Sequence, residues 1–265
     1  MKTILVPVGS SRNAQSHLQY AVDFAKAFGA KIYVVQIYNV YTKAGTMIKI
    51  DHILERESKA FLESHVESID KKNVEVYTRT FKGKLVDTIE KICKALDVDL
   101  IILEPRTNSI KDEVYLGKTS GKIIKQTQIP ALIVPEGYVY KPIVKILIAL
   151  KSAIVKKEGA LSPLLAIKNQ YKAIVNMLLV KTPFHNEADF ELNNAFKDMV
   201  TNITKAESPT TFQAVLEHSK SHYPDLLCVV RRKRGFFIKL WENNTVLKKD
   251  FHSTQLPVLV LSGLK

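Results

Sequence analysis

The stretch that decides the fold is residues 4–37, which read ILVPVGSSRNAQSHLQYAVDFAKAFGAKIYVVQI. It opens with one short apolar run, residues 4–8, and closes with a second, residues 31–37. Between them, apolar side chains recur at the spacing of one helical face as far as Gly29, a residue typical of the left-handed end of a helix. Because the first run is continuously apolar, it is typical of a central parallel strand covered on both faces. The second run, which includes Lys31 and Gln36, is predicted to be a further strand. The stretch predicts a strand–helix–strand unit.

The same alternation continues to residue 134. Further helices are predicted near residues 50–69, 85–96 and 118–126, and further strands near residues 74–80, 100–103 and 131–134. Strands that alternate with helices pair in parallel through right-handed crossovers. The first half of the chain is therefore predicted to be an α/β domain with a doubly wound, five-stranded parallel sheet.

The second half repeats this pattern in a shorter form. Residues 146–150, 225–230 and 257–261 match the first, fourth and last strands of the first half, and a short helix is expected over 188–199. The chain is thus predicted to hold two tandem copies of one domain. The first copy covers residues 1–136, the linker 137–142, and a shorter, more divergent second copy 143–265.

Composition indicates where the protein is expected to be located and what its cysteines and net charge imply. No apolar run approaches the roughly 20 residues that cross a bilayer, so we expect a cytoplasmic protein without a membrane partner. Cys93 and Cys228 lie inside predicted apolar elements and are interpreted as core residues. The formal net charge of +13 can attract polyanions. The lysines are spread along the chain, however, which favours a solvated surface.

Two segments carry a resemblance to a known family. ILVPVGSS at residues 4–11 resembles the start of a universal stress protein domain, and LGKTSGKIIKQTQIPALIVP at residues 116–135 resembles its end. The resemblance implies the strand order 3-2-1-4-5 in each copy. It also implies a pseudo-dimer in which the last strands, residues 131–134 and 258–261, lie side by side. A further homodimer stays possible.

The family's ATP-binding members have an Asp just after the first strand and a G-x2-G-x9-G-S/T loop after the fourth. Glycines let the loop backbone approach the phosphates, and a helix N-terminus offers free N–H donors. In the first copy Gly9 stands at the Asp position, and the loop positions are Glu104, Thr107, Gly117 and Lys118. In the second copy Lys151 replaces the Asp, and the loop positions are Arg231, Arg234, Asn244 and Thr245. Both sites are interpreted as degenerate, so no cofactor is expected.

One alternative keeps a nucleotide in the first copy. A vestigial site for ATP or AMP would use Val8, Gly9, Gly117, Lys118 and Thr119. The last three imitate the end of a P-loop, but the glycine required five residues before Gly117 is replaced by Asp112. Helix-entry chemistry, with Thr119 as a cap, explains the same residues.

A second alternative lies in the second copy. Arg231, Arg232, Lys233 and Arg234 follow its fourth strand, where guanidinium groups could contact a small anionic ligand or a polyanion. Nucleic acid is disfavoured because no stacking platform accompanies the basic run. Phe236, Phe237 and Trp241 come next, and they either fill the vacated nucleotide cleft or form a patch for a protein partner.

Catalysis is not supported by the sequence. No nucleophile–base pair, carboxylate dyad or metal cluster is evident among the residues. His218 and His222 have i, i+4 spacing without a third ligand, and they are interpreted as surface residues. We therefore expect a non-catalytic binding or regulatory module, without a metal, whose partner is unidentified.

Overall fold

The computed structural model describes residues 1–9, 13–39, 51–105, 118–155, 159–183, 185–192, 194–231 and 256–262. The first half contains β1 (Thr3–Pro7), α1 (Ala14–Phe28), β2 (Lys31–Tyr38), α2 (Asp51–Glu67), β3 (Val76–Lys82), α3 (Leu85–Leu96), β4 (Leu100–Leu103), α4 (Lys118–Gln126) and β5 (Ala131–Ile133). The second half contains β6 (Lys145–Leu150), α5 (Ser162–Tyr171), β7 (Ile174–Lys181), η1 (Glu187–Phe190), α6 (Asn194–Lys197), β8 (Asn202–Glu207), α7 (Thr211–His222), β9 (Leu226–Arg231) and β10 (Val258–Ser262).

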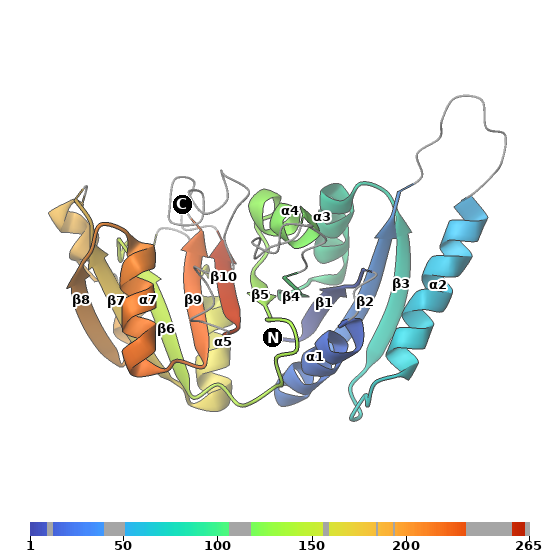
Figure 1. Cartoon of the computed structure of the whole chain (residues 1–265), viewed down its shortest axis with the longest axis horizontal. Helices are drawn as coiled ribbons and strands as arrows, with labels where there is room; N and C mark the ends of the chain where they lie inside the picture. Colours follow the sequence, from blue (N-terminus) through green and yellow to red (C-terminus); the bar gives the residue numbers. More distant parts are fainter. Residues whose placement is uncertain are drawn as a thin grey trace.

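The described strands form one continuous ten-stranded sheet in the order β3-β2-β1-β4-β5-β10-β9-β6-β7-β8 (Figure 1). Each half has the order 3-2-1-4-5, and all pairs are parallel except β5 with β10. These two last strands run antiparallel, with Leu132 opposite Leu259. The predicted fold class is confirmed, including the pseudo-dimeric pairing. Because the sheet runs through both copies, the domain boundaries proposed above stay a prediction.

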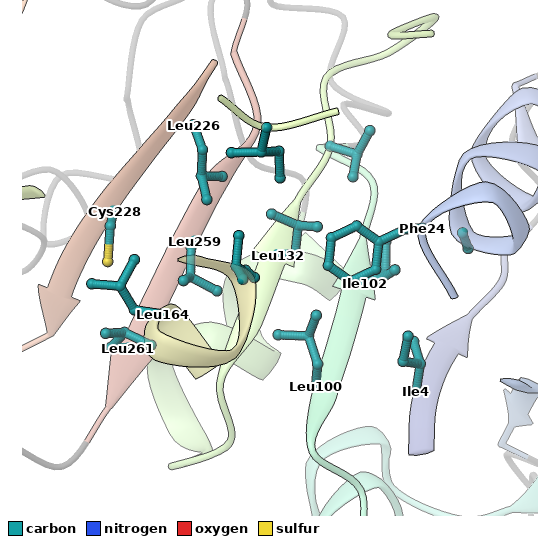
Figure 2. Packing of buried hydrophobic residues seen from close by; sticks show 14 of the residues in the cluster. Ile4, Phe24, Leu100, Ile102, Leu132, Leu164, Leu226, Cys228, Leu259 and Leu261 are labelled. Carbon is teal, nitrogen blue, oxygen red and sulfur yellow. The ribbon is translucent and has the colours of Figure 1, made fainter. Parts of the chain in front are cut away.

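The helices cover both faces of the sheet. Within β1, Ile4 and Val6 face α1 and belong to one buried cluster, whereas Leu5 belongs to the cluster under α3 and α4. The first cluster continues without a break into the second half, where Leu164 of α5 and Leu259 of β10 belong to it (Figure 2). This alternation of side chains between two buried faces explains why β1, β4 and β5 are apolar throughout.

Several local expectations are met. Gly29 adopts φ 59° at the end of α1, and its N–H donates to the carbonyls of Ala25 and Lys26. Such a positive φ is easy for glycine and strained for most other residues. Cys93 and Cys228 are buried, and burial raises the pKa of the Cys93 thiol to about 12. Both cysteines are therefore core residues rather than reactive thiols.

The prediction of one helix over residues 188–199 is wrong. The structure divides this segment into the 3-10 turn η1 and the single turn α6. Two consecutive asparagines in the sequence, 193 and 194, explain the division, because asparagine favours helix starts over helix interiors. Phe196 and Met199 are buried and anchor the segment.

The segment predicted as a linker is packed between the two halves. Tyr138 and Tyr140 meet the ring of Tyr20 on α1 in edge-to-face contacts, with centroid distances of 6.1 and 5.7 Å. The hydroxyl of Tyr140 lies 2.9 Å from that of Tyr171 at the end of α5. Edge-to-face contacts of this kind stabilise aromatic clusters beyond their burial. The tyrosines therefore help to fix the two halves in one arrangement.

In both halves an aspartate carboxylate links the start of the first strand to the start of the fourth strand through hydrogen bonds. Before β4, the carboxylate of Asp99 accepts hydrogen bonds from the backbone N–H groups of Lys2 (2.6 Å) and Thr3 (3.0 Å). Before β9, Asp225 accepts from the backbone of Val144 (3.0 Å) and Lys145 (2.9 Å), and from Nζ of Lys141 (2.7 Å). The same residue type thus performs the same task in both repeats.

Replacing Asp225 by alanine is expected to lower the free energy of unfolding by about 1.5–3 kcal/mol, the range for hydrogen bonds to a charged group. Burial acts to raise the pKa of this carboxyl, but the hydrogen bonds from Lys141, Lys145 and Val144 outweigh it and leave the pKa lowered. The stabilisation is therefore present above the pKa of unfolded Asp and is lost as the pH falls through the folded value.

Urea unfolding of Asp225→Ala across pH 3–8 would measure both effects. Asp198→Ala is the matched control, because this side chain is exposed in the second half. Equal losses in the two variants would show that the hydrogen bonds of Asp225 contribute nothing.

Candidate functional site

The ends of β1 and β4 bring the predicted first-copy residues to one edge of the sheet. The two strands pair in parallel, so the residues that follow them emerge at the same edge. Val8 is buried and extends the ladder by one bond, because its N–H donates to the carbonyl of Val35 at 2.8 Å. Gly9 is exposed, and Glu104 follows β4 at the same level. This edge is where ligands bind in doubly wound folds.

Helix α4 is attached to the same edge. Its residue Ser120 is buried, and its hydroxyl donates to the backbone carbonyl of Glu104 at 2.6 Å. Lys118 is the first residue of α4, and Thr119 is exposed beside it. Gly117 lies outside the described residues. Val8, Gly9 and Thr119 therefore lie in the region of one sheet edge, and their role in binding stays a prediction.

A shallow hollow lies beside this edge, between the start of α1 and the segment after β5. It is lined by Ser16, His17, Glu104, Val134, Pro135, Glu136, Gly137 and Tyr138. Asn13, just before α1, donates from its side-chain amide to the carboxylate of Glu136. The hollow is therefore flanked by two carboxylates, those of Glu104 and Glu136.

His17 is the residue of this hollow that the sequence analysis missed. Its side chain is buried, and Nε2 has no hydrogen-bond partner among the described residues. Burial lowers the pKa of His17 to about 4, an effect that the nearby backbone of Ile102 offsets only in part. The burial of His17 could have been predicted from its position on the apolar face of α1, three residues after Ala14 and four before Ala21.

Most of the site residues predicted for the second repeat lie outside the described residues. Lys151, which replaces the family's Asp, is exposed after β6. Arg231 ends β9, where its backbone is in register with Ser262 of β10. Residues 232–234 of the basic run, the aromatic residues Phe236, Phe237 and Trp241, and Asn244 and Thr245 lie outside the described residues. Whether the rings fill the cleft or form a patch stays a hypothesis.

The described part of the chain contains neither a metal-binding cluster nor a membrane-spanning helix. Its histidine, cysteine and acidic side chains form no group of three or more that could hold a metal ion. None of the described helices is both long enough and apolar enough to cross a bilayer. The candidate site is thus the sheet edge of the first repeat together with the hollow beside it.

Comparison with known proteins decides the family. The sequence profile of the Universal stress protein family matches residues 1–135, which is half of the chain. The chain belongs to this family. A curated universal stress protein from Methanocaldococcus jannaschii is 22% identical to it over 138 residues, covering 50% of this chain and 81% of the relative.

Solved structures extend the likeness to both halves of this universal stress protein. A universal stress protein from Archaeoglobus fulgidus matches with a TM-score of 0.69 at 18% identity, over 98% of this chain and 96% of that one. A protein of unknown function from Pseudomonas aeruginosa matches with a TM-score of 0.58 at 16% identity, over 98% of this chain and 92% of that one. At such identities the likeness establishes the fold alone.

Proposed function

We propose that this universal stress protein is a non-catalytic binding or regulatory module of the stress response that does not take ATP in the family's manner. The observation that carries the second part is the placement of Glu104. This residue stands at the first glycine position of the family's loop, and it lines the hollow together with Glu136. The non-catalytic part rests on the sequence, which supplies no nucleophile–base pair. The cytoplasm is the proposed location.

Electrostatics supports this proposal. A triphosphate at the edge of the first repeat would meet the carboxylate of Glu104 where the ATP-binding pattern has glycine. Like charges at close range repel more strongly near a protein surface than in bulk water. The side chain of Glu104 also occupies space that a glycine would leave for the approach of phosphate to the backbone. At the adenine end, Gly9 supplies no carboxylate. We therefore expect the module to bind a ligand or partner other than ATP.

Titration calorimetry with MgATP is expected to give a dissociation constant weaker than about 100 μM, corresponding to less than about 5.5 kcal/mol of binding free energy. The matched variant is Glu104→Gly, which restores the family's glycine and removes one carboxylate. We expect this variant to bind MgATP more tightly than the wild type does.

A low-micromolar constant for ATP or AMP with the wild type would contradict the proposal. The nucleotide-sensor alternative, with Val8, Gly9 and Thr119 at the site, would then be preferred. Mass spectrometry of denatured protein, which identifies any co-purified small molecule, provides an independent check of the same point.

A further inference from the structure

Strand β3 ends the described sheet on the side of the first repeat (Figure 1). It pairs in parallel with β2, and the described sheet holds no strand on its other side. The N–H of Ile32 donates to the carbonyl of Glu75, just before β3, at 2.8 Å, so the backbone of Glu75 faces β2. Backbone groups alternate along a strand, and those of Val76 and Thr78 therefore face the open edge. Such an edge can pair with a strand of another chain.

The side chains beside this edge are exposed on one face of the sheet. Val76 packs against the buried cluster that contains Leu62 of α2. Because side chains alternate between the two faces of a strand, Glu75, Tyr77 and Arg79 lie together on the face opposite α2. Glu75 and Arg79 are exposed, and Tyr77 is 41% exposed although its ring is large and apolar. This face of the edge is therefore accessible to a partner.

The contacts of Tyr77 hold its ring in one orientation. The ring stacks on Tyr33 of β2, with centroids 5.1 Å apart and planes inclined by 22°. Its hydroxyl donates to Oε2 of Glu75 at 2.6 Å, which leaves Oε1 as an acceptor. None of the ion pairs among the described residues includes Arg79. The edge thus presents an ordered aromatic ring between a carboxylate and a guanidinium group.

This order of side chains is complementary to itself. In an antiparallel pair of β3 strands centred on Tyr77, the two Tyr77 rings face each other and each Glu75 faces Arg79 of the other copy. Val76 and Thr78, whose backbone groups face the edge, then form the hydrogen-bonded pairs, so the tyrosines form a non-hydrogen-bonded pair, in which side chains are closest. A pair centred on Arg79 would instead set two arginines opposite each other, and like charges directly opposite are unfavourable.

We propose that two copies of this chain associate edge to edge through β3, antiparallel around Tyr77. The stack of Tyr33 on Tyr77 then continues into the second copy, with a Glu75–Arg79 pair on each side. Aromatic pairs and opposite-charge pairs are cross-strand contacts that stabilise sheets. A second copy is the partner that fits, because twofold symmetry supplies every complement from one sequence. This contact is separate from the β5–β10 junction and independent of the proposed function. It is short, so the dimer is weak and depends on concentration.

Sedimentation velocity of the full chain, from micromolar to several hundred micromolar protein, tests this association. The wild type should pass from monomer to dimer as its concentration rises. Arg79→Glu and Glu75→Arg should each weaken the dimer about tenfold, because both cross-strand pairs become like-charged. An equal mixture of these two variants should form the dimer again, since every pair in it joins opposite charges. Lys205→Glu, the same change on the opposite edge strand β8, is the matched control and should dimerise as the wild type does.

A wild type that remains monomeric at every concentration would overturn the proposal, as would charge variants that associate no better when mixed than alone. A dimer that Lys205→Glu breaks and Arg79→Glu leaves intact would also overturn it. Urea unfolding checks that each variant is folded. Should a charge variant fail to fold, Thr78→Pro provides a second test, because it removes an N–H that faces the edge, and edge strands tolerate proline there. Thr78→Pro must then lose the dimer, and unchanged dimerisation would exclude pairing through β3.

Discussion

Replacing Leu132 by alanine is expected to lower the free energy of unfolding by about 2–5 kcal/mol, the range for large-to-small changes in a packed core. Leu132 is fully buried on β5 and faces Leu259 across the only antiparallel pair of the described sheet. Its side chain belongs to the cluster that passes from Phe24 in the first half to Leu164 in the second (Figure 2). The cavity therefore weakens the contact that joins the two repeats.

The shape of the transition tests the role of this junction. Because the sheet and both buried clusters run through the two repeats, urea unfolding of the wild type and of Leu132→Ala should each show a single transition. Leu165→Ala is the control, since this leucine on α5 is 44% exposed and its loss should change stability by no more than about 0.5 kcal/mol. Two transitions, with only the first-repeat one shifted by Leu132→Ala, would show that the halves unfold independently.

Acid is expected to destabilise the protein through His17, by up to about 3 kcal/mol. The pKa of this buried histidine falls from 6.5 in the unfolded chain to about 4 in the folded one, and each unit corresponds to about 1.4 kcal/mol. Between these values the unfolded state binds more protons than the folded state. The free energy of unfolding therefore decreases as the pH falls from 6.5 toward 4, and the full stability returns above 6.5.

The variant His17→Leu isolates this contribution. Leucine fills a similar volume with an apolar side chain and removes the buried Nε2, which has no partner among the described residues. Urea unfolding at pH 7.5 and pH 4.5 should show a smaller loss of stability for this variant than for the wild type, with the difference approaching 2–3 kcal/mol, about 1.4 kcal/mol per unit. His52→Leu on the exposed face of α2 should keep the loss seen in the wild type. The same loss in His17→Leu as in the wild type would show that the ring is protonated without penalty.

Much of the architecture follows from short-range sequence pattern. Residues 4–8 and 100–103 are apolar without interruption because both of their faces are covered, and this signal alone places them at the centre of a parallel sheet. Gly29 marks the end of α1 for an equally local reason, its left-handed backbone. The loss of the family's glycines at positions 104 and 107 could also be predicted, because a motif is a property of the sequence itself.

Other features depend on residues that are distant in the sequence. The carboxylate of Asp99 meets the backbone of Lys2 and Thr3 only because β1 and β4 are neighbours. Asp225 repeats this contact across a similar separation. Neither set of hydrogen bonds can be predicted from a local sequence pattern, because each aspartate is separated from its backbone partners by far more residues than a helical or strand period.

The sequence by itself determined the elements of the first half, three strands of the second half and the loss of the family's nucleotide-loop residues, because each of these is encoded in periodicity or in residues at fixed spacing. Only the tertiary structure decided that Nε2 of the buried His17, beside Glu104 and Glu136, has no partner among the described residues, and that β5 and β10 pair with Leu132 opposite Leu259. The reason is physical: burial and charge at a site are sums over side chains that folding brings together, and no single stretch of sequence contains those sums.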